Sequence, residues 1–179
     1  MGSYYYLAAQ LPYLIYGQPL PMSPAAFKEL ARSAMSHEEG AVLDACALDP
    51  AAVPPVKSEF LSSWGEWESA LRLNLARLRS ARLKREPVDA PEFPAGAAAA
   101  AKAALAIESP LDAEIFLDRA RWNAIESLQG IDYFSENTIY AYLLKLLLME
   151  RRQAFKTEEG FGEYKTLYAS ILEQAGESK

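Results

Sequence analysis

The sequence of 179 residues has little of what most catalytic and metal sites require. It contains one cysteine, Cys46, and one histidine, His37. A single cysteine excludes a disulfide within the chain and is typical of a reducing compartment. Together the two residues are too few for the usual ligand sets of zinc. We expect Cys46 to be buried in the core and His37 to be solvated in the first turn of a helix.

Motifs for nucleotide binding, secretion and membrane insertion are also missing. Residues 160–162 form a two-glycine turn without the third glycine and preceding strand of a phosphate loop. The first residues lack the basic flank and apolar core of a secretory signal. The most apolar segment, 139–149, is too short to cross a bilayer. A net charge of −6 argues against nucleic acid as a partner. We therefore expect a soluble cytoplasmic protein without cofactor or metal.

Carboxylates are numerous, but no catalytic arrangement can be assigned to them. Four of them share one predicted helix, and hydrolysis by a carboxylate pair would require a pocket and a raised pKa, which a sequence does not show. We predict that the chain is not an enzyme and name no catalytic residue. Within the same helix Asp118, Arg119, Arg121 and Trp122 could form a buried polar cluster. The four carboxylates are Asp112, Glu114, Asp118 and Glu126.

The distribution of proline predicts the fold. All eleven prolines lie at or before Pro110, and the last 69 residues contain none. Because proline interrupts helices, residues 1–94 are expected to form short elements joined by loops, and residues 95–179 to form long antiparallel helices. No second convincing strand is present to pair with the ambiguous segment 4–11. The prediction is one all-α domain, a bundle of about six to seven helices.

Helix boundaries follow from capping residues. Ser23–Pro24 and Ser109–Pro110 combine an N-cap with proline at the first helical position, and Ser36 to Glu39 has the capping-box pattern. Ser135 should cap the apolar helix, and Gly130 should end the helix before it. The expected helices span about 24–35, 37–48, 58–85, 95–106, 110–129 and 136–155, followed by an amphipathic helix that carries Tyr164, Leu167, Tyr168, Ile171 and Leu172.

The helix over 58–85 has a regular apolar seam and a basic end. Apolar residues recur from Phe60 to Leu78 at spacings of four and three, with Asn74 as a polar break. Cations gather late in this helix, where they suit the helix dipole. Two interpretations stay open: solvated charges that compensate the dipole, or a contact surface for an acidic partner. The candidate interface residues here are Arg72, Arg79, Arg82 and Arg85.

Aromatic residues are the second candidate for an interface. The chain has ten tyrosines and three tryptophans, and five of the tyrosines lie before Gly17 beside prolines. Tyrosine and tryptophan dominate interfaces as well as cores. The first tyrosines could therefore clamp the N-terminal arm to the domain or bind a partner. The candidate interface residues in the arm are Tyr4, Tyr5 and Tyr6.

Two parts of the sequence resemble a bacterial family that is encoded together with V-type (also called A-type) ATPases. The first part comprises residues 4–12 (YYYLAAQLP) and 23–27 (SPAAF). The second comprises residues 121–123 (RWN), 133–134 (YF), 141–146 (AYLLKL) and 150–151 (ER). Together the two parts cover roughly half of the chain. The tyrosine-rich opening and the Tyr-Leu-Leu-Lys-Leu helix are the more specific features, and neither is a catalytic signature.

That family is in turn similar to the rotary-ATPase component known as the C subunit (the d subunit in eukaryotes), through residues such as Leu117–Arg119 and Arg151–Arg152. The resemblance implies a non-catalytic, all-helical protein that docks between the central stalk and the membrane rotor ring. Through these partners it would be held at the cytoplasmic face of the inner membrane. The chain is much shorter than this component, so it could be a partial homologue, an accessory factor or an assembly factor. The alternative is a stand-alone helical adaptor or regulator that binds another cytoplasmic protein.

Overall fold

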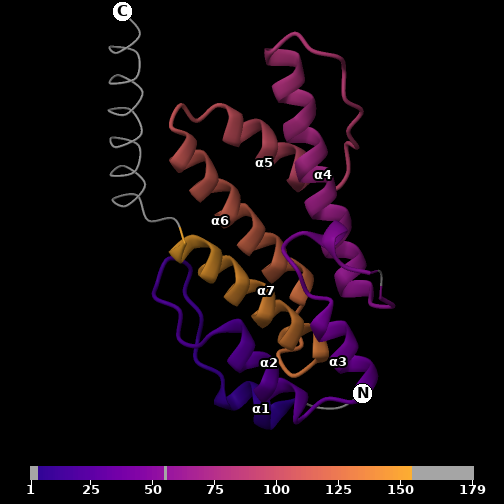
Figure 1. Cartoon of the computed structure of the whole chain (residues 1–179), viewed down its shortest axis with the longest axis vertical. Coiled ribbons are helices and arrows are strands. Elements are labelled where there is room, and N and C mark those ends of the chain that lie inside the picture. Colours follow the sequence, from indigo (N-terminus) through magenta and orange to yellow (C-terminus); the bar gives the residue numbers. More distant parts are fainter. Residues whose placement is uncertain (1–3, 55, 155–179) are drawn as a thin grey trace, which may run out of the picture.

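The computed structural model describes residues 4–54 and 56–154. In this part the chain forms seven α helices, one short 3₁₀ helix and no strand, which confirms the all-α single-domain prediction (Figure 1). The expected helix with Tyr164 and Leu172 lies outside the described residues. The elements are α1 (Tyr5–Gln10), α2 (Pro24–Arg32), α3 (His37–Asp44), η1 (Pro50–Ala52), α4 (Glu59–Arg82), α5 (Ala95–Leu105), α6 (Pro110–Gln129) and α7 (Glu136–Gln153).

Most of the predicted caps are present. The side chain of Ser23 accepts a hydrogen bond from the amide of Ala26, and that of Ser109 accepts one from Asp112. Ser36 and Glu39 form the reciprocal capping box. Ser135 occupies the N-cap position of α7 as predicted, but its hydroxyl makes no capping hydrogen bond and donates instead to the carbonyl of Asp132 at 2.9 Å. The hydroxyl thus stabilises the turn before α7.

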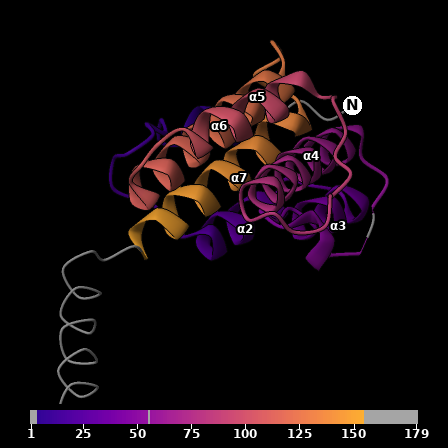
Figure 2. The same ribbon diagram turned by 90° about the horizontal axis from the view of Figure 1, so that it is seen from above.

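Helix α7 forms the centre of the core, as its apolar sequence predicts. Ile139, Leu143, Leu144 and Leu146 are completely buried. Helices α2 and α3 pack against α7 from one side and α6 packs from another (Figures 1 and 2). The N-terminal segment crosses a further face, where the Tyr142 hydroxyl donates to the carbonyl of Pro12 at 2.9 Å. Surrounding elements therefore enclose this helix on most sides.

The alanine-rich helix α5 packs tightly against α4 and is not a loose spacer. Ala97, Ala101 and Ala104 are buried, and their small side chains let the two backbones come close. On α4 the predicted seam from Phe60 to Asn74 is buried. The amide of Asn74 donates to the carbonyl of Pro91 at 2.9 Å, which fixes the proline-rich connection between the helices. The polar break in the seam therefore has a structural partner.

Candidate functional site

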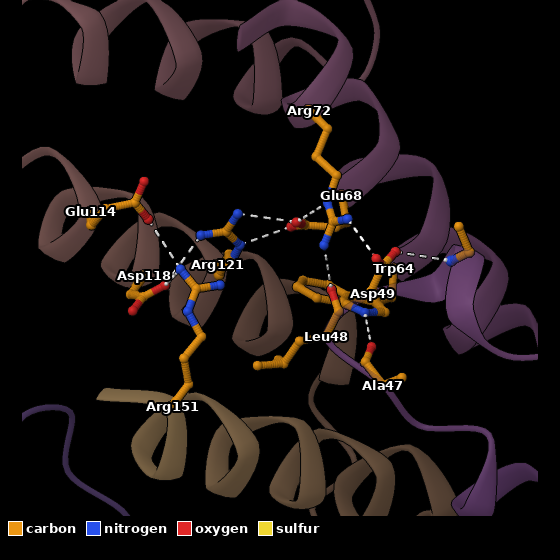
Figure 3. A network of polar contacts seen from close by, with 11 residues as sticks. Ala47, Leu48, Asp49, Trp64, Glu68, Arg72, Glu114, Asp118, Arg121 and Arg151 are labelled. Atoms are coloured by element: carbon orange, nitrogen blue, oxygen red, sulfur yellow. Dashed lines mark hydrogen bonds and ion pairs between the residues drawn. The ribbon is translucent and has the colours of Figure 1, made fainter. Parts of the chain in front are cut away.

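A buried network of ion pairs joins α4, α6 and α7 (Figure 3). The guanidinium of Arg121 donates to both carboxylate oxygens of Glu68, at 2.9 and 3.1 Å, and to Asp118 at 3.2 Å. Arg151 extends from α7 to Asp118 and to Glu114, at 3.2 and 3.1 Å. The side chain of Glu68 has no exposed surface, and Asp118 and Arg121 are almost as deeply buried. Each buried charge is therefore paired with an opposite charge.

The geometry of this network indicates structural support. Burial raises the pKa of Asp118, although the neighbouring Arg151 and Arg121 oppose that shift. Among the described residues, no buried side-chain nitrogen or oxygen lacks a hydrogen-bond partner. A carboxylate that already accepts two arginines, as Asp118 does, has little capacity left for a substrate. The network holds three helices in register.

Only part of this network was predictable from the sequence. Asp118 and Arg121 lie together as expected, but Arg119 points elsewhere and stacks on the ring of Tyr16 at 5.1 Å. Trp122 donates to Glu126 and not to the cluster. Glu68 is not among the residues that the sequence indicated for this cluster. Glu68 lies four residues after Trp64 and three before Leu71, and both of these residues are buried. This spacing places Glu68 on the buried face of the helix, which was the available signal.

The late cations of α4 separate into two groups. Arg72 is occupied: it pairs with Glu68 at 2.8 Å and with Asp49 at 2.9 Å, and its hydrogen bond lowers the pKa of Asp49. The remaining cations are exposed and form no ion pair with any residue in the described ranges. We call them the basic end; they are Arg77, Arg79, Arg82, Lys84 and Arg85.

The chain leaves α4 sharply within this basic end. Lys84 has a φ of 52°, and the amide of Arg85 donates back to the carbonyl of Ser80 at 2.9 Å. Arg82 donates to the carbonyl of Leu105, at the end of α5. Beyond Leu75 no residue of α4 is fully buried, so the last turns project from the body and present their cations to solvent.

The three N-terminal tyrosines do not share one environment. Tyr4 is only 4% exposed, and its amide donates to the carbonyl of Phe134 at 3.0 Å, so it belongs to the core and is not available to a partner. Tyr5 and Tyr6 are exposed, and the ring of Tyr5 lies 5.0 Å from that of Phe134. The clamp interpretation therefore holds for Tyr4, and the partner interpretation stays open for Tyr5 and Tyr6.

A second clamp holds the segment that follows α1. The guanidiniums of Arg119 and Arg152 each lie over the ring of Tyr16, at 5.1 and 4.9 Å from its centroid, and the ring of Trp122 lies near it. Its hydroxyl donates to the carbonyl of Ile115 at 3.0 Å. Burial raises the pKa of Tyr16, while Arg152 opposes the shift. Tyr16 thus fastens the N-terminal segment across α6 and α7.

Exposed aromatic residues gather where α1 meets the α6–α7 connection. We call this surface the aromatic end; its residues are Tyr5, Tyr6, Tyr13, Ile131, Tyr133 and Phe134, all exposed. A groove of about 560 Å³ opens here between the N-terminal segment, the end of α6 and one face of α7. Its lining includes Tyr13, Tyr133, Phe134, Tyr142, Glu126 and Lys145. Exposed large apolar side chains gathered beside a groove are typical of interaction sites.

The aromatic end and the basic end lie far apart. In Figure 1 the last turns of α4 are at the top of the described body, and α1 with the α6–α7 connection is at the bottom. The ion network joins α4, whose last turns form the basic end, to α6 and α7, whose connection belongs to the aromatic end (Figure 1). The molecule therefore presents two chemically different surfaces at opposite ends of one packed body.

Comparison with protein-family models, with curated proteins and with solved structures gives no match to this chain. The resemblance to the ATPase-associated family, and the partners that it implies, stay predictions. Within residues 4–54 and 56–154, no three His, Cys, Asp or Glu side chains are placed to share a metal ion. In the same ranges no helix has the length and apolar character needed to cross a membrane.

Proposed function

We propose that this chain is a non-catalytic subunit or accessory protein of a bacterial V-type ATPase that docks between the central stalk and the membrane rotor. The observation that carries the proposal is the separation of the aromatic end from the basic end. A protein with two different exposed surfaces at opposite ends can bind two partners and hold them at a fixed distance. The basic end suits an acidic partner, and the aromatic end suits a partner with apolar side chains.

The packing between the two ends supports a mechanical role. The Glu68–Arg121 pair joins α4 to α6, and Arg151 joins α6 to α7. A buried and fully paired polar network favours one arrangement of helices over alternatives, because any slip would leave a charge unpaired. A body that resists deformation can transmit force between its partners.

The residues that carry the family resemblance also lie together in space. Residues 4–12 contact the second part through the hydrogen bonds from Tyr4 to Phe134 and from Tyr142 to Pro12. In the second part, Arg121 and Arg151 share the buried network. Phe27, at the end of residues 23–27, packs on Tyr142 with 4.8 Å between the rings, so the resemblance covers a continuous unit built from α1, the start of α2, α6 and α7.

Affinity purification at native expression level tests the proposal. The tagged protein should recover ATPase subunits, whereas Tyr133→Ser and Arg79→Glu should each lose a different subset of them. Phe93→Ser is the matched control, because Phe93 is exposed but lies outside both ends. Recovery of no ATPase subunit from an intact complex would overturn the proposal. Recovery of other proteins through the same two surfaces would favour the stand-alone adaptor.

A further inference from the structure

We infer that the groove of the aromatic end binds an amphipathic helix of a partner protein, and that a lysine or arginine of this helix sits against the carboxyl end of α6. The inference rests on the proposed function only in requiring a protein partner. It adds the form and the charge of the segment that this surface recognises.

The floor of the groove has the repeat of a helix face. Thr138, Tyr142 and Lys145 line it from α7, at spacings of four and three residues. Seven residues of a helix extend about 10 Å, or two turns. Residues of α1 and the last turn of α6 form the walls, and no described residue offers a strand edge. A helix lying along α7 would continue the packing of the bundle through anchors three and four residues apart.

The charges around the groove favour a cation in the occupant. Helix α6 has no basic residue in its last turn, and no described N–H group from outside the helix donates to the carbonyls of residues 126–129. The negative end of its dipole is thus open beside Glu126, which is half exposed and accepts from Trp122 and Lys145 through Oε1 alone. Asp132, in the connection after α6, and Glu136, the first residue of α7, add negative charge nearby in the sequence without lining the groove. Lys145, the one cation among the described lining residues, is largely buried and already pairs with Glu126 at 3.2 Å.

The aromatic side chains of the groove suit the same occupant. Tyr13 and Tyr133 are 88% and 66% exposed and line the groove together with the end of α6. Their rings can cover apolar side chains and can also attract an ammonium or guanidinium group through their faces. The open carbonyls at the end of α6 and the half-exposed carboxylate of Glu126 disfavour nucleic acid and anionic membranes. An apolar helix with a basic flank matches both properties.

Binding of a designed peptide to the purified protein tests this inference. The probe is a fluorescein-labelled 14-residue helix of about equal leucine and arginine content, with leucine on one face; the matched peptide has glutamate for arginine. Anisotropy should show the arginine peptide binding at least about tenfold more tightly than the glutamate peptide. Tyr133→Ser and Glu126→Gln should each weaken binding of the arginine peptide by about tenfold.

Two controls separate the groove from general attraction to an acidic protein. Phe93→Ser and Glu66→Gln change an exposed aromatic and an exposed carboxylate elsewhere, and should alter binding less than about twofold. Circular dichroism verifies that each variant is folded. Equal binding of the two peptides would overturn the inference, as would equal losses in groove and control variants. If the arginine peptide does not bind but Tyr133→Ser still loses ATPase subunits in purification, the helix inference is wrong and the proposed function stands. If the peptide binds at the groove but no ATPase subunit is recovered, the ATPase proposal is wrong and the helix inference stands.

Discussion

Arg121 on α6 donates two hydrogen bonds to the carboxylate of Glu68 on α4, across a separation of 53 residues in the sequence. The bidentate geometry is the strongest that an arginine and a carboxylate can form. Both side chains are buried, so the pair joins two helices at the centre of the molecule. Such a pair adds little to the free energy of unfolding compared with well-packed apolar side chains in its place. The loss of one member, however, leaves a buried charge without its partner.

Arg121→Met should therefore destabilise the fold strongly. The substitution leaves Glu68 paired only with Arg72 and deprives Asp118 of one of its two arginines. We expect a loss of about 3–5 kcal/mol in the free energy of unfolding, measured by urea denaturation. Arg79→Met, at an exposed site on the same helix as Glu68, should change it by less than about 0.5 kcal/mol. Equal effects of the two substitutions would show that the network is not a structural support.

Leu146→Asp should abolish folding. Leu146 is completely buried in α7, and an unpaired charge there costs several kcal/mol, comparable to the ~5–15 kcal/mol stability of a typical domain. Circular dichroism should show loss of helix, and size-exclusion chromatography should show an expanded or aggregated chain. Leu83→Asp, at an exposed position, is the matched control and should fold. A helical, monomeric Leu146→Asp variant would mean that α7 is not the centre of the core.

Cys46 should be unreactive in the folded protein. Its thiol is buried, and burial raises its pKa to about 12. Because the thiolate is the reactive form, DTNB at pH 8 should modify it at least about a hundredfold more slowly than in urea. A Cys46→Ala chain that carries Ala99→Cys on the exposed face of α5 should react rapidly without urea. Fast modification of native Cys46 would contradict its buried position.

Alkaline pH should unfold the protein through its buried tyrosines. Burial raises the pKa of Tyr142 from 10.0 to about 12, and it also raises those of Tyr4 and Tyr140. Because the folded state favours the neutral phenol, this stabilisation is complete below pH 10 and is lost as the pH rises from about 10 to 12. Urea denaturation across this range should show the decline, and Tyr142→Phe should make it shallower. A free energy of unfolding that is constant up to pH 12 would be inconsistent with these pKa shifts.

The sequence predicted what depends on local patterns. Serine caps, the seam of α4 and the apolar character of α7 all follow from residues within a few turns of one another. Pairings between distant segments were not predictable: the Tyr142 hydroxyl meets a carbonyl 130 residues away, and the groove exists only because residues 8–14 lie beside residues 126–145. The same reason explains why Tyr4 and Arg72 counted as interface candidates, since their partners, Phe134 and Asp49, are identified only by the fold.

Site-specific photo-crosslinking in the source organism identifies what each of the two ends contacts. A benzoylphenylalanine placed at Tyr133 reports on the aromatic end, and one placed at Arg79 reports on the basic end; both side chains are exposed, so the substitution should not disturb folding. We expect crosslinks from the two positions to two different subunits of a V-type ATPase. Crosslinks to no ATPase subunit, or to one and the same partner surface from both ends, would contradict the proposed function.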